Sequence, residues 1–344
     1  TCPCALSLAT PAAVTAATGA LTRSGILTTR GHALETLART THMIFDKTGT
    51  LTKGKLQLVR LMLLGNQDEE GCLSLAAGLE AQSEHPLARA ILVQADQRVS
   101  MEDIRAFPGK GLEGFYEGKR YWLGSPDSLS DLSLESPDVK IEPGETLVYL
   151  VEESQLLAAF VLRDEIRPEA ANTIRVLRSM GLEVELLSGD RPETVAHVAE
   201  KLGIQTHSGG MLPDDKLSRI KELQGQGKVV AMVGDGVNDA PVLAAAQVSV
   251  AMGGGSQLAH ASADMVLLSE HLERLPEAVF VARRTLGIIR QNLGWAIGYN
   301  LIALPLAAAG WIAPWMAAIG MSASSLIVVV NALRLSDNER KRSN

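Results

Sequence analysis

The sequence predicts an α/β protein in which a parallel sheet carries the reactive residues, an α+β domain is inserted, and transmembrane helices are attached. Two apolar segments, residues 41–45 and 229–233, have the length and character of buried parallel strands. Each is followed at once by a motif that contains carboxylates. Residues 293–333 carry no charged side chain, which is enough for two membrane spans of about 20 residues each.

The average composition conceals this membrane part. The chain has 344 residues, 46% of them hydrophobic, and a formal net charge of −7, values that also suit a soluble two-domain protein. The charge balance gives no reason to expect a nucleic-acid partner.

The beginning of the chain reads as the middle of a membrane helix, predicted over residues 1–22. Cys2-Pro3-Cys4 runs straight into small and apolar residues without an initial Met, so we expect the chain to begin inside a larger protein. A proline between two thiols interrupts helical hydrogen bonding, and thiolates in hydrocarbon are costly unless they hold a metal. Redox motifs usually place two residues between their cysteines. Cys72 lies alone in an apolar stretch and is predicted to be core.

Three carboxylates define the predicted reactive site. The first strand leads into Asp46 of DKTGT, and the second leads into Asp235 and Asp239 of GDGVNDAP. Open α/β sheets build their sites beyond the carboxyl ends of parallel strands. Carboxylates that converge there repel one another unless a cation lies between them, so the pattern implies a Mg²⁺ site. One of the three can then act as a nucleophile toward a phosphoryl group.

Changes of character along the chain suggest the domain limits. Turn signals and short alternating strands mark an inserted α+β domain over residues 56–158, which divides the sheet domain into 23–55 and 159–285. The remaining segments are two spans and a charged tail, predicted at 286–310, 312–334 and 335–344.

The two C-terminal spans are predicted to form a hairpin in a bilayer. Gly310 and Pro314 mark the turn, and Trp311 and Trp315 are expected at the membrane interface. Basic residues flank both outer ends, so both ends should face the cytoplasm. A long hairpin buried in a protein core is the alternative.

Together these motifs resemble the C-terminal half of the P-type ATPases, whose sheet is of the haloacid-dehalogenase-like type. The resemblance implies that ATP phosphorylates Asp46, and that this carboxylate, the Thr48 backbone carbonyl and Asp235 bind Mg²⁺. It also implies that Lys47 neutralises charge nearby and that Asn238 and Asp239 organise the phosphate site.

Two further motifs of that family have counterparts here. The family's TGD motif reads Ser188-Gly189-Asp190, and serine keeps the hydroxyl that hydrogen-bonds a phosphoryl oxygen. The family lysine that contacts the aspartyl phosphate corresponds to Lys216 in LPDDK.

The inserted domain resembles the nucleotide-binding domain of the heavy-metal pumps. The string SEHPL contains His85, which in that branch contacts adenine, and Glu80 matches an acidic residue of the adenine region. A Gly-x-Gly-x-x-Gly pattern is weak evidence alone, but the resemblance implies that its glycines let backbone approach nucleotide; they are Gly109, Gly111 and Gly114. Ser125 stands where copper pumps often have Asn, and we assign it no role.

The cysteine motif and the last spans resemble the copper-transporting subset of this branch. The resemblance implies a Cu⁺ site built from side chains of three helices, namely Cys2, Cys4, Tyr299, Asn300, Met321 and Ser325. Soft sulfur ligands suit Cu⁺, or Ag⁺ as its mimic, whereas Zn²⁺ would prefer a carboxylate or imidazole, and neither span has one. A copper chaperone is the expected donor of the metal.

The implied activity is ATP-driven Cu⁺ export through an aspartyl phosphate, in a bacterial inner membrane with the catalytic domains in the cytoplasm. In the family, an actuator domain with a TGE motif and further helices precede the cysteine motif. This chain carries neither, so we expect it not to pump by itself. The strings around the motifs look most like the branch that supplies copper for respiratory oxidase assembly, with a detoxification exporter as the alternative.

Three other functions compete with copper export. A Zn²⁺/Cd²⁺ pump of the same branch predicts acidic residues in the last spans. A haloacid-dehalogenase-like phosphatase with a membrane anchor predicts a second Asp two residues after the nucleophile, where this chain has Thr48. A copper-binding membrane protein without catalysis would not need Asp46, Lys216 and Asp235 together.

Overall fold

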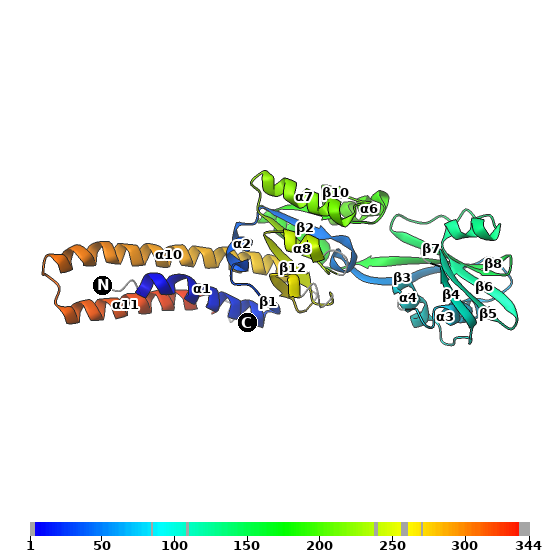
Figure 1. Ribbon diagram of the computed structural model, residues 1–344, viewed down its shortest axis with the longest axis horizontal. Coiled ribbons are helices and arrows are strands. Elements are labelled where there is room, and N and C mark those ends of the chain that lie inside the picture. The colour runs from blue at the N-terminus through cyan, green and yellow to red at the C-terminus, as the bar shows by residue number, and fades with distance from the viewer. Residues whose placement is uncertain are drawn as a thin grey trace.

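The protein consists of three parts in a row (Figure 1). The computed structural model describes residues 4–83, 85–107, 110–236, 240–255, 261–269 and 271–336. Long helices form one end, a mostly parallel sheet domain lies in the middle, and a second sheet domain forms the other end. The sheet domains correspond to the predicted sheet domain and its insertion.

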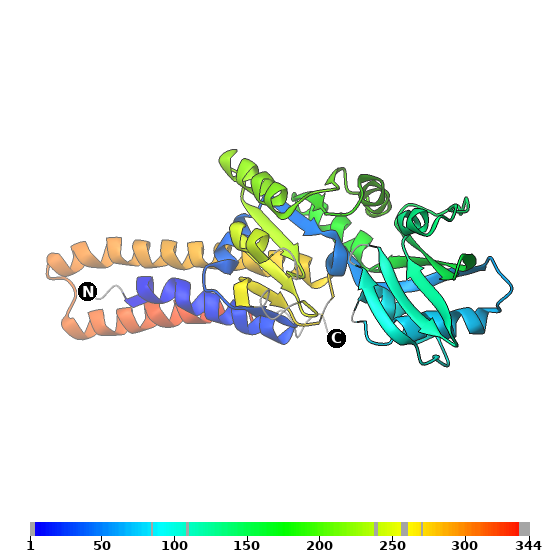
Figure 2. The ribbon, with the colours of Figure 1, turned by 45° about the vertical axis from the view of Figure 1, so that its right-hand side comes forward.

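Three helices form the predicted membrane end: α1 (Cys4–Arg23), α10 (Arg274–Ala308) and α11 (Pro314–Leu333). Alanines spaced by four residues along α1 are buried, and Ala5 and Ala9 pack against α10 and α11. Small side chains let helix backbones approach closely. Both ribbon views show α1 alongside the half of the hairpin that is nearer the sheet (Figures 1 and 2).

Length and composition would allow two helices to cross a membrane, α1 from Ala5 and α11 over its whole length. The other predicted span, 286–310, forms the distal part of α10, which begins at Arg274 and ends at Ala308. α10 does not meet the same criterion, because its charged residues extend to Arg290 and the amides that follow, at positions 291, 292 and 300, lower the hydropathy of its second half. The turn between α10 and α11 contains Gly310 in the left-handed region, with φ of 74°, as glycine readily allows.

The middle domain is a seven-stranded sheet in the order β1-β13-β12-β11-β2-β9-β10. All its strand pairs are parallel except β1 with β13. The strands are β1 (Ile26–Thr28), β2 (His42–Asp46), β9 (Glu183–Leu187), β10 (Thr206–Ser208), β11 (Val230–Gly234), β12 (Val248–Met252) and β13 (Met265–Leu267). β2 lies centrally between β11 and β9, so the loops after these strands meet at one edge.

Helices cover both faces of this sheet, which explains why its strands are apolar throughout. One face packs against α2 (Ala33–Arg39), α5 (Ala170–Ser179), α6 (Pro192–Leu202) and the start of α10. The other packs against α7 (Pro213–Gly225) and α8 (Ala240–Ala245). Met43 and Phe45 of β2 enter the first core and Ile44 enters the second, as alternation along a strand requires.

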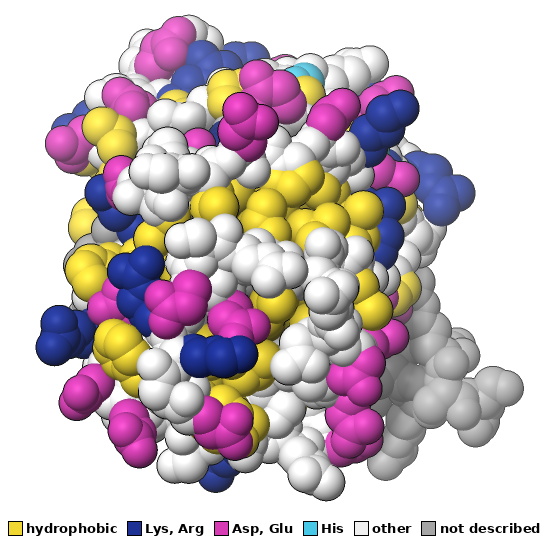
Figure 3. Space-filling view, turned by 90° about the vertical axis from the view of Figure 1, so that its right-hand side faces the viewer, with side chains coloured by type: hydrophobic (Ala, Val, Ile, Leu, Met, Phe, Trp, Pro, Cys, Tyr) yellow, Lys and Arg dark blue, Asp and Glu magenta, His cyan; other side chains and the backbone are white. Residues whose placement is uncertain are grey.

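The inserted domain is a six-stranded antiparallel sheet in the order β3-β8-β7-β6-β5-β4. Its strands are β3 (Thr52–Leu63), β4 (Glu102–Phe107), β5 (Gly111–Tyr116), β6 (Lys119–Gly124), β7 (Glu145–Glu152) and β8 (Gln155–Ile166). Helices α3 (Glu69–Leu79) and α4 (Pro86–Gln94) cover one face and form a core with it. Viewed from this end of the molecule, acidic and basic side chains surround a band of hydrophobic ones (Figure 3).

Two long strands join the sheet domains. β3 leaves the loop that follows Asp46, and β8 returns beside it with Thr52 opposite Ile166. The paired strands therefore begin at the reactive edge of the middle domain and end inside the insertion. The insertion's sheet spans Thr52–Ile166, a few residues beyond the predicted 56–158 at each side.

Candidate active site

Asp46 is the last residue of β2, and its carboxylate is held by Lys216. Lys216 Nζ donates to Asp46 Oδ1 over 2.7 Å, and both residues are buried. Lys216 lies in the first turn of α7, after Pro213 has started that helix. A buried ion pair of this kind needs good geometry and further hydrogen bonds to be favourable. The structure thus brings together the predicted nucleophile and the predicted phosphate-contacting lysine.

The loop after Asp46 is shaped by a buried arginine that sequence reasoning missed. Arg167 Nε donates to the carbonyls of Thr50 at 2.9 Å and Thr52 at 3.2 Å, and Arg167 Nη2 donates to the Gly49 carbonyl at 3.2 Å. Arg167 comes directly after β8, so the returning strand supplies the residue that fixes the outgoing loop. An arginine at the end of a long strand and before a proline was the available signal.

Lys47 faces the other predicted motif. Its ammonium group forms an ion pair with Asp190, and Lys47 itself is buried. Ser188 is also buried, and its hydroxyl accepts a hydrogen bond from the Asp190 amide at 3.2 Å. The loop after β9 is therefore tied to the loop after β2.

Asp235 follows β11 and lies against the DKTGT loop. A Cβ built on Gly49 would be 2.5 Å from Asp235 Oδ2, and Gly49 has φ of 69°, so only glycine fits between the two loops. Asp46, Asp235 and the Thr48 carbonyl are hard oxygen donors that suit Mg²⁺. No group of three metal-binding side chains occurs among the described residues. Asn238 and Asp239, predicted at this site, lie outside the described part.

A second ion pair connects α7 to the sheet. The Arg219 guanidinium donates to both carboxylate oxygens of Glu185, at 2.9 and 3.2 Å. Glu185 is buried in β9, and its neighbour in the register is Ile44 of β2. Because Arg219 lies one turn after Lys216, this brace fixes the helix that carries Lys216. The two bonds to Glu185 raise the pKa of Arg219 further above its ordinary value.

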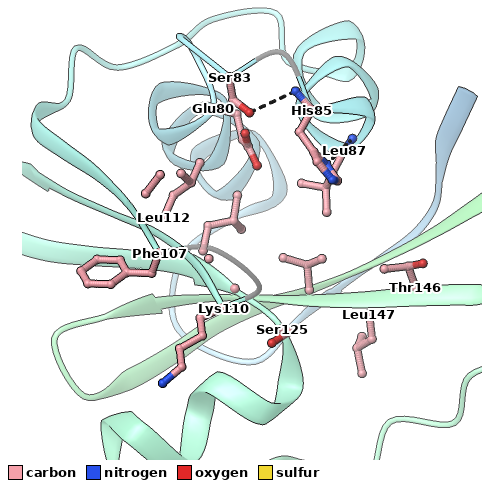
Figure 4. A pocket seen from close by; sticks show the side chains of 15 residues that line it. Glu80, Ser83, His85, Leu87, Phe107, Lys110, Leu112, Ser125, Thr146 and Leu147 are labelled. Atoms are coloured by element: carbon pink, nitrogen blue, oxygen red, sulfur yellow. Dashed lines mark hydrogen bonds between the residues drawn. The ribbon is translucent and has the colours of Figure 1, made fainter. Parts of the chain in front are cut away.

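The inserted domain contains a mostly apolar cavity of about 410 Å³ (Figure 4). Glu80 and His85 reach it from the helical side, Phe107 and Leu147 come from strands, and Ser125 follows β6. Flat apolar walls with a few polar groups are typical of small-molecule sites. Thus two of the residues predicted to bind adenine, Glu80 and His85, line one cavity.

Glu80 has an unusual environment in this cavity. It is 5% exposed, and its buried Oε2 atom has no hydrogen-bond partner among the described residues. Burial raises the pKa of Glu80, against opposing effects of Ser83 and His85. The His85 Nδ1 atom accepts a hydrogen bond from the Leu87 amide at 3.2 Å.

Two glycines of the pattern also lie in close contact with neighbouring elements of the domain. Gly111 lines the cavity, but a Cβ there would strike the Leu123 carbonyl oxygen of the neighbouring strand. Gly114 does not line the cavity, and its Cβ would lie 2.8 Å from Leu79 of α3. A side chain at either position would therefore require neighbouring atoms of the domain to move. Gly109 lies outside the described residues.

A second cavity, of about 690 Å³, continues from the first toward the sheet edge. His85, Ser125 and Thr146 line both. The second is also lined by Lys47 and Asp190 of the middle domain. A ligand seated beside Glu80 could therefore extend toward Asp46 along a continuous path.

The predicted copper ligands are partly brought together. Tyr299 and Met321 line a cavity of about 530 Å³ between α10 and α11, and the Tyr299 hydroxyl lies against Gly320. The Asn300 amide instead donates to the Ala296 carbonyl at 2.8 Å, within its own helix. Asn300 and Ser325 are not part of that cavity's lining. Cys2 and the side chain of Cys4 lie outside the described part of the chain.

Comparisons with known proteins define the class. The model of the haloacid dehalogenase-like hydrolase family matches residues 40–247. These limits enclose Asp46 of β2, Lys216 of α7 and the insertion. The chain belongs to the haloacid dehalogenase-like hydrolases.

More particular similarities lie within that class. The probable copper-transporting ATPase SynA of Synechococcus elongatus is 42% identical over 344 residues, which cover 96% of this chain and 43% of the relative. A solved structure of a zinc-transporting PIB-type ATPase in the E2.Pi state is 36% identical with a TM-score of 0.80, covering 97% of this chain and 56% of that one. A second solved structure is that of the catalytic domain of the CPx-ATPase CopB-B, from work on its conformational changes upon nucleotide binding. It is 28% identical with a TM-score of 0.63, and the match covers 76% of this chain and 98% of that one.

Over most of its length the chain is therefore similar to P-type ATPases, and these similarities confirm the predicted fold class. The chain spans a little under half the length of the curated relative.

Proposed function

We propose that the full-length protein exports Cu⁺ across a membrane, using ATP to phosphorylate Asp46. The observation that carries this proposal is the buried Asp46–Lys216 pair at the end of β2, 2.7 Å long. The next residues of the same loop, Lys47 and Thr48, line the interdomain cavity. Lys216 orients the carboxylate toward the incoming phosphoryl group and lowers the energy of charge that develops on its oxygens.

The neighbouring residues divide the remaining tasks. Lys47 and Asp190 fix the two loops to each other, and Ser188 offers a hydroxyl beside them. Asp46, Asp235 and the Thr48 carbonyl would hold Mg²⁺, which supplies positive charge against the phosphate oxygens. Asn238 and Asp239 belong to the same motif and are proposed to organise this site.

The apolar cavity is proposed to bind the adenine base. The unpartnered Oε2 of Glu80 supports this, because a buried polar atom without a partner favours a ligand that supplies one. A raised pKa keeps that carboxyl protonated to higher pH, which lets it donate as well as accept a hydrogen bond. His85 lies at the cavity wall nearest the path to Asp46.

The transported ion is proposed to bind between helices. Cys2 and Cys4 would supply soft thiolates, and Met321 and Tyr299, two further members of the sequence-predicted site, line one cavity between α10 and α11. Asn300 and Ser325 complete the proposed Cu⁺ set. Delivery by a copper chaperone, a bacterial inner membrane with cytoplasmic catalytic domains, and a role in respiratory oxidase assembly are parts of the same proposal.

Metal-dependent acyl-phosphate formation tests the proposal. The full-length protein in membranes is labelled from ATP with Cu⁺, Ag⁺ or Zn²⁺, beside Asp46→Asn and Cys2→Ser/Cys4→Ser variants. We expect labelling with Cu⁺ or Ag⁺ that both variants abolish. Labelling driven by Zn²⁺ would make the protein a zinc pump, as in the structural relative. Labelling that does not depend on metal and persists without the two cysteines would contradict the proposed transport function.

A further inference from the structure

The cavity between the two sheet domains carries the wrong net charge for a polyphosphate. Its lining includes four carboxylates against two basic side chains, Lys47 and Arg191; the carboxylates are Asp127, Glu145, Asp164 and Asp190. A nucleotide triphosphate entering this space needs positive groups that are not already neutralised. A bound Mg²⁺ would supply part of the charge, and the protein must supply the remainder.

The basic groups around the reactive edge already have partners. Lys47 pairs with Asp190, Lys216 pairs with Asp46, and Arg167 is bound to loop carbonyls. Arg163 pairs with both Glu142 and Glu145 at 2.7 and 2.5 Å. Lys47, Arg163 and Arg167 cannot turn toward a phosphate without breaking these bonds, and Lys216 is committed to Asp46 and the group transferred to it.

Arg191 is different. It is exposed, it lines the interdomain cavity, and within the described part of the chain its guanidinium has no ion pair or side-chain hydrogen bond. Its backbone is well anchored, because the Asp190 carbonyl accepts from the Gly210 amide and the Arg191 carbonyl accepts from the Val195 amide. The Arg191 side chain can therefore turn toward a ligand at little cost, while its backbone stays in place.

We propose that Arg191 is a further catalytic residue, which binds the β- and γ-phosphates of ATP while the γ-phosphoryl group moves to Asp46. This inference rests on the proposed phosphorylation of Asp46. Arginine presents several donors in a planar fork that matches phosphate oxygens. In the transfer, the bond from the γ-phosphorus to its bridging oxygen breaks as a bond to an Asp46 oxygen forms. ADP leaves with the electron pair, and Arg191 binds the charge that accumulates on it.

Phosphoryl donors with and without a β-phosphate separate this role from a structural one. Arg191→Ala and Arg191→Lys are compared in the full-length protein, labelled either from ATP or from acetyl phosphate. We expect Arg191→Ala to slow labelling from ATP roughly 10- to 100-fold, as for loss of one charged donor, with labelling from acetyl phosphate unchanged. Arg191→Lys should fall between. Arg175→Ala is the matched control, because Arg175 is an exposed arginine of the same domain, bonded only to Asn172 among the described residues.

Equal slowing from both donors would overturn the proposal, since Arg191 would then act on Asp46 rather than on the nucleotide. Unchanged labelling from both would also overturn it.

Nucleotide affinity gives a second readout that does not need Asp46 to react. In titrations, Arg191→Ala should lower the affinity for ATP and ADP roughly tenfold and leave the affinity for AMP unchanged. An equal loss of affinity for all three nucleotides, or no loss for any of them, would overturn the assignment. If the unsubstituted protein binds ATP but forms no acyl phosphate, the proposed function fails and the affinity series still decides the role of Arg191.

Discussion

The sheet edge that carries Asp46 and the cavity that contains Glu80 solve opposite physical problems. At the edge, buried charges are paired: Asp46 with Lys216, and Lys47 with Asp190. In the cavity, Glu80 is equally buried, yet one of its oxygens has no partner in the part of the chain that the structure describes. Reaction chemistry needs charges fixed before the substrate arrives. Recognition of a base needs a polar group that is satisfied only when the base is present.

The difference also appears in what surrounds each site. Loops after three parallel strands converge at the edge, and Arg167 ties one of them to the strand that returns from the insertion. The cavity is lined mainly by apolar side chains of strands and helices within one domain. Substitutions at the edge should therefore affect reaction and folding together, whereas those in the cavity should affect binding and pH dependence.

The largest effect is expected from Asp46→Asn. An amide cannot attack the γ-phosphorus, so acyl-phosphate formation from ATP should fall to background. Binding of ATP should persist, because the Glu80 cavity does not contain Asp46. Acid-stable labelling and an ATP titration measure the two quantities on the same preparation. Labelling that persists would show that another residue is the nucleophile. Loss of ATP binding would show that the two sites are not separable.

Lys216→Met tests whether the fixed charge is needed. The variant leaves the buried Asp46 carboxylate without its cation, which typically costs about 3–5 kcal/mol. Labelling from ATP should fall by roughly two to three orders of magnitude, as for loss of one preorganised donor. Urea denaturation followed within the sheet domain and quenched-flow labelling are the measurements. Lys216→Arg, which retains the charge, should recover most of the stability. A fully stable Lys216→Met protein would show that Asp46 is protonated in the resting state.

Arg219→Met probes the brace that supports Lys216. It removes two charge-assisted hydrogen bonds from buried Glu185, each worth about 1.5–3 kcal/mol at most, and it leaves ATP affinity untouched. We expect a smaller loss of labelling rate than for Lys216→Met. The double variant Glu185→Gln/Arg219→Met should recover part of the stability, since it removes the orphaned carboxylate. If the double variant is no better than the single one, the pair does not act as a unit.

Much of this arrangement could be predicted because the chemistry lies in contiguous strings. The apolar segment before Asp46 identifies β2, and the position of Asp46 after it follows from parallel-sheet geometry. The string around Lys216 likewise identifies the start of α7. In both places the local pattern determines the local structure.

What could not be predicted depends on residues that are distant in sequence. Arg167 contacts a loop more than 100 residues earlier, and Glu185 meets Arg219 across a sheet–helix interface. Nothing in the neighbourhood of either arginine reports its partner. The close approach of Gly114 to Leu79 also joins two different elements, because a Cβ on Gly114 would lie 2.8 Å from that side chain. The long α10 was divided by its charge pattern, although its backbone continues as one helix.

The smallest effect expected is the pH dependence introduced by Glu80. Its pKa in the folded protein is raised above 4.5, mainly by burial, so the ionised form is disfavoured in the folded state. Its contribution to stability is therefore fully present below the unfolded pKa and is lost as pH rises through the folded pKa. Glu80→Gln cannot ionise, so it should match the unsubstituted protein in acid and become more stable above the raised pKa. Amide hydrogen exchange of α3, which ends beside Glu80, measures this locally. A stability difference that grows toward low pH instead would mean that Glu80 is stabilised as a carboxylate, and the cavity would then resemble the sheet edge in having its charges paired.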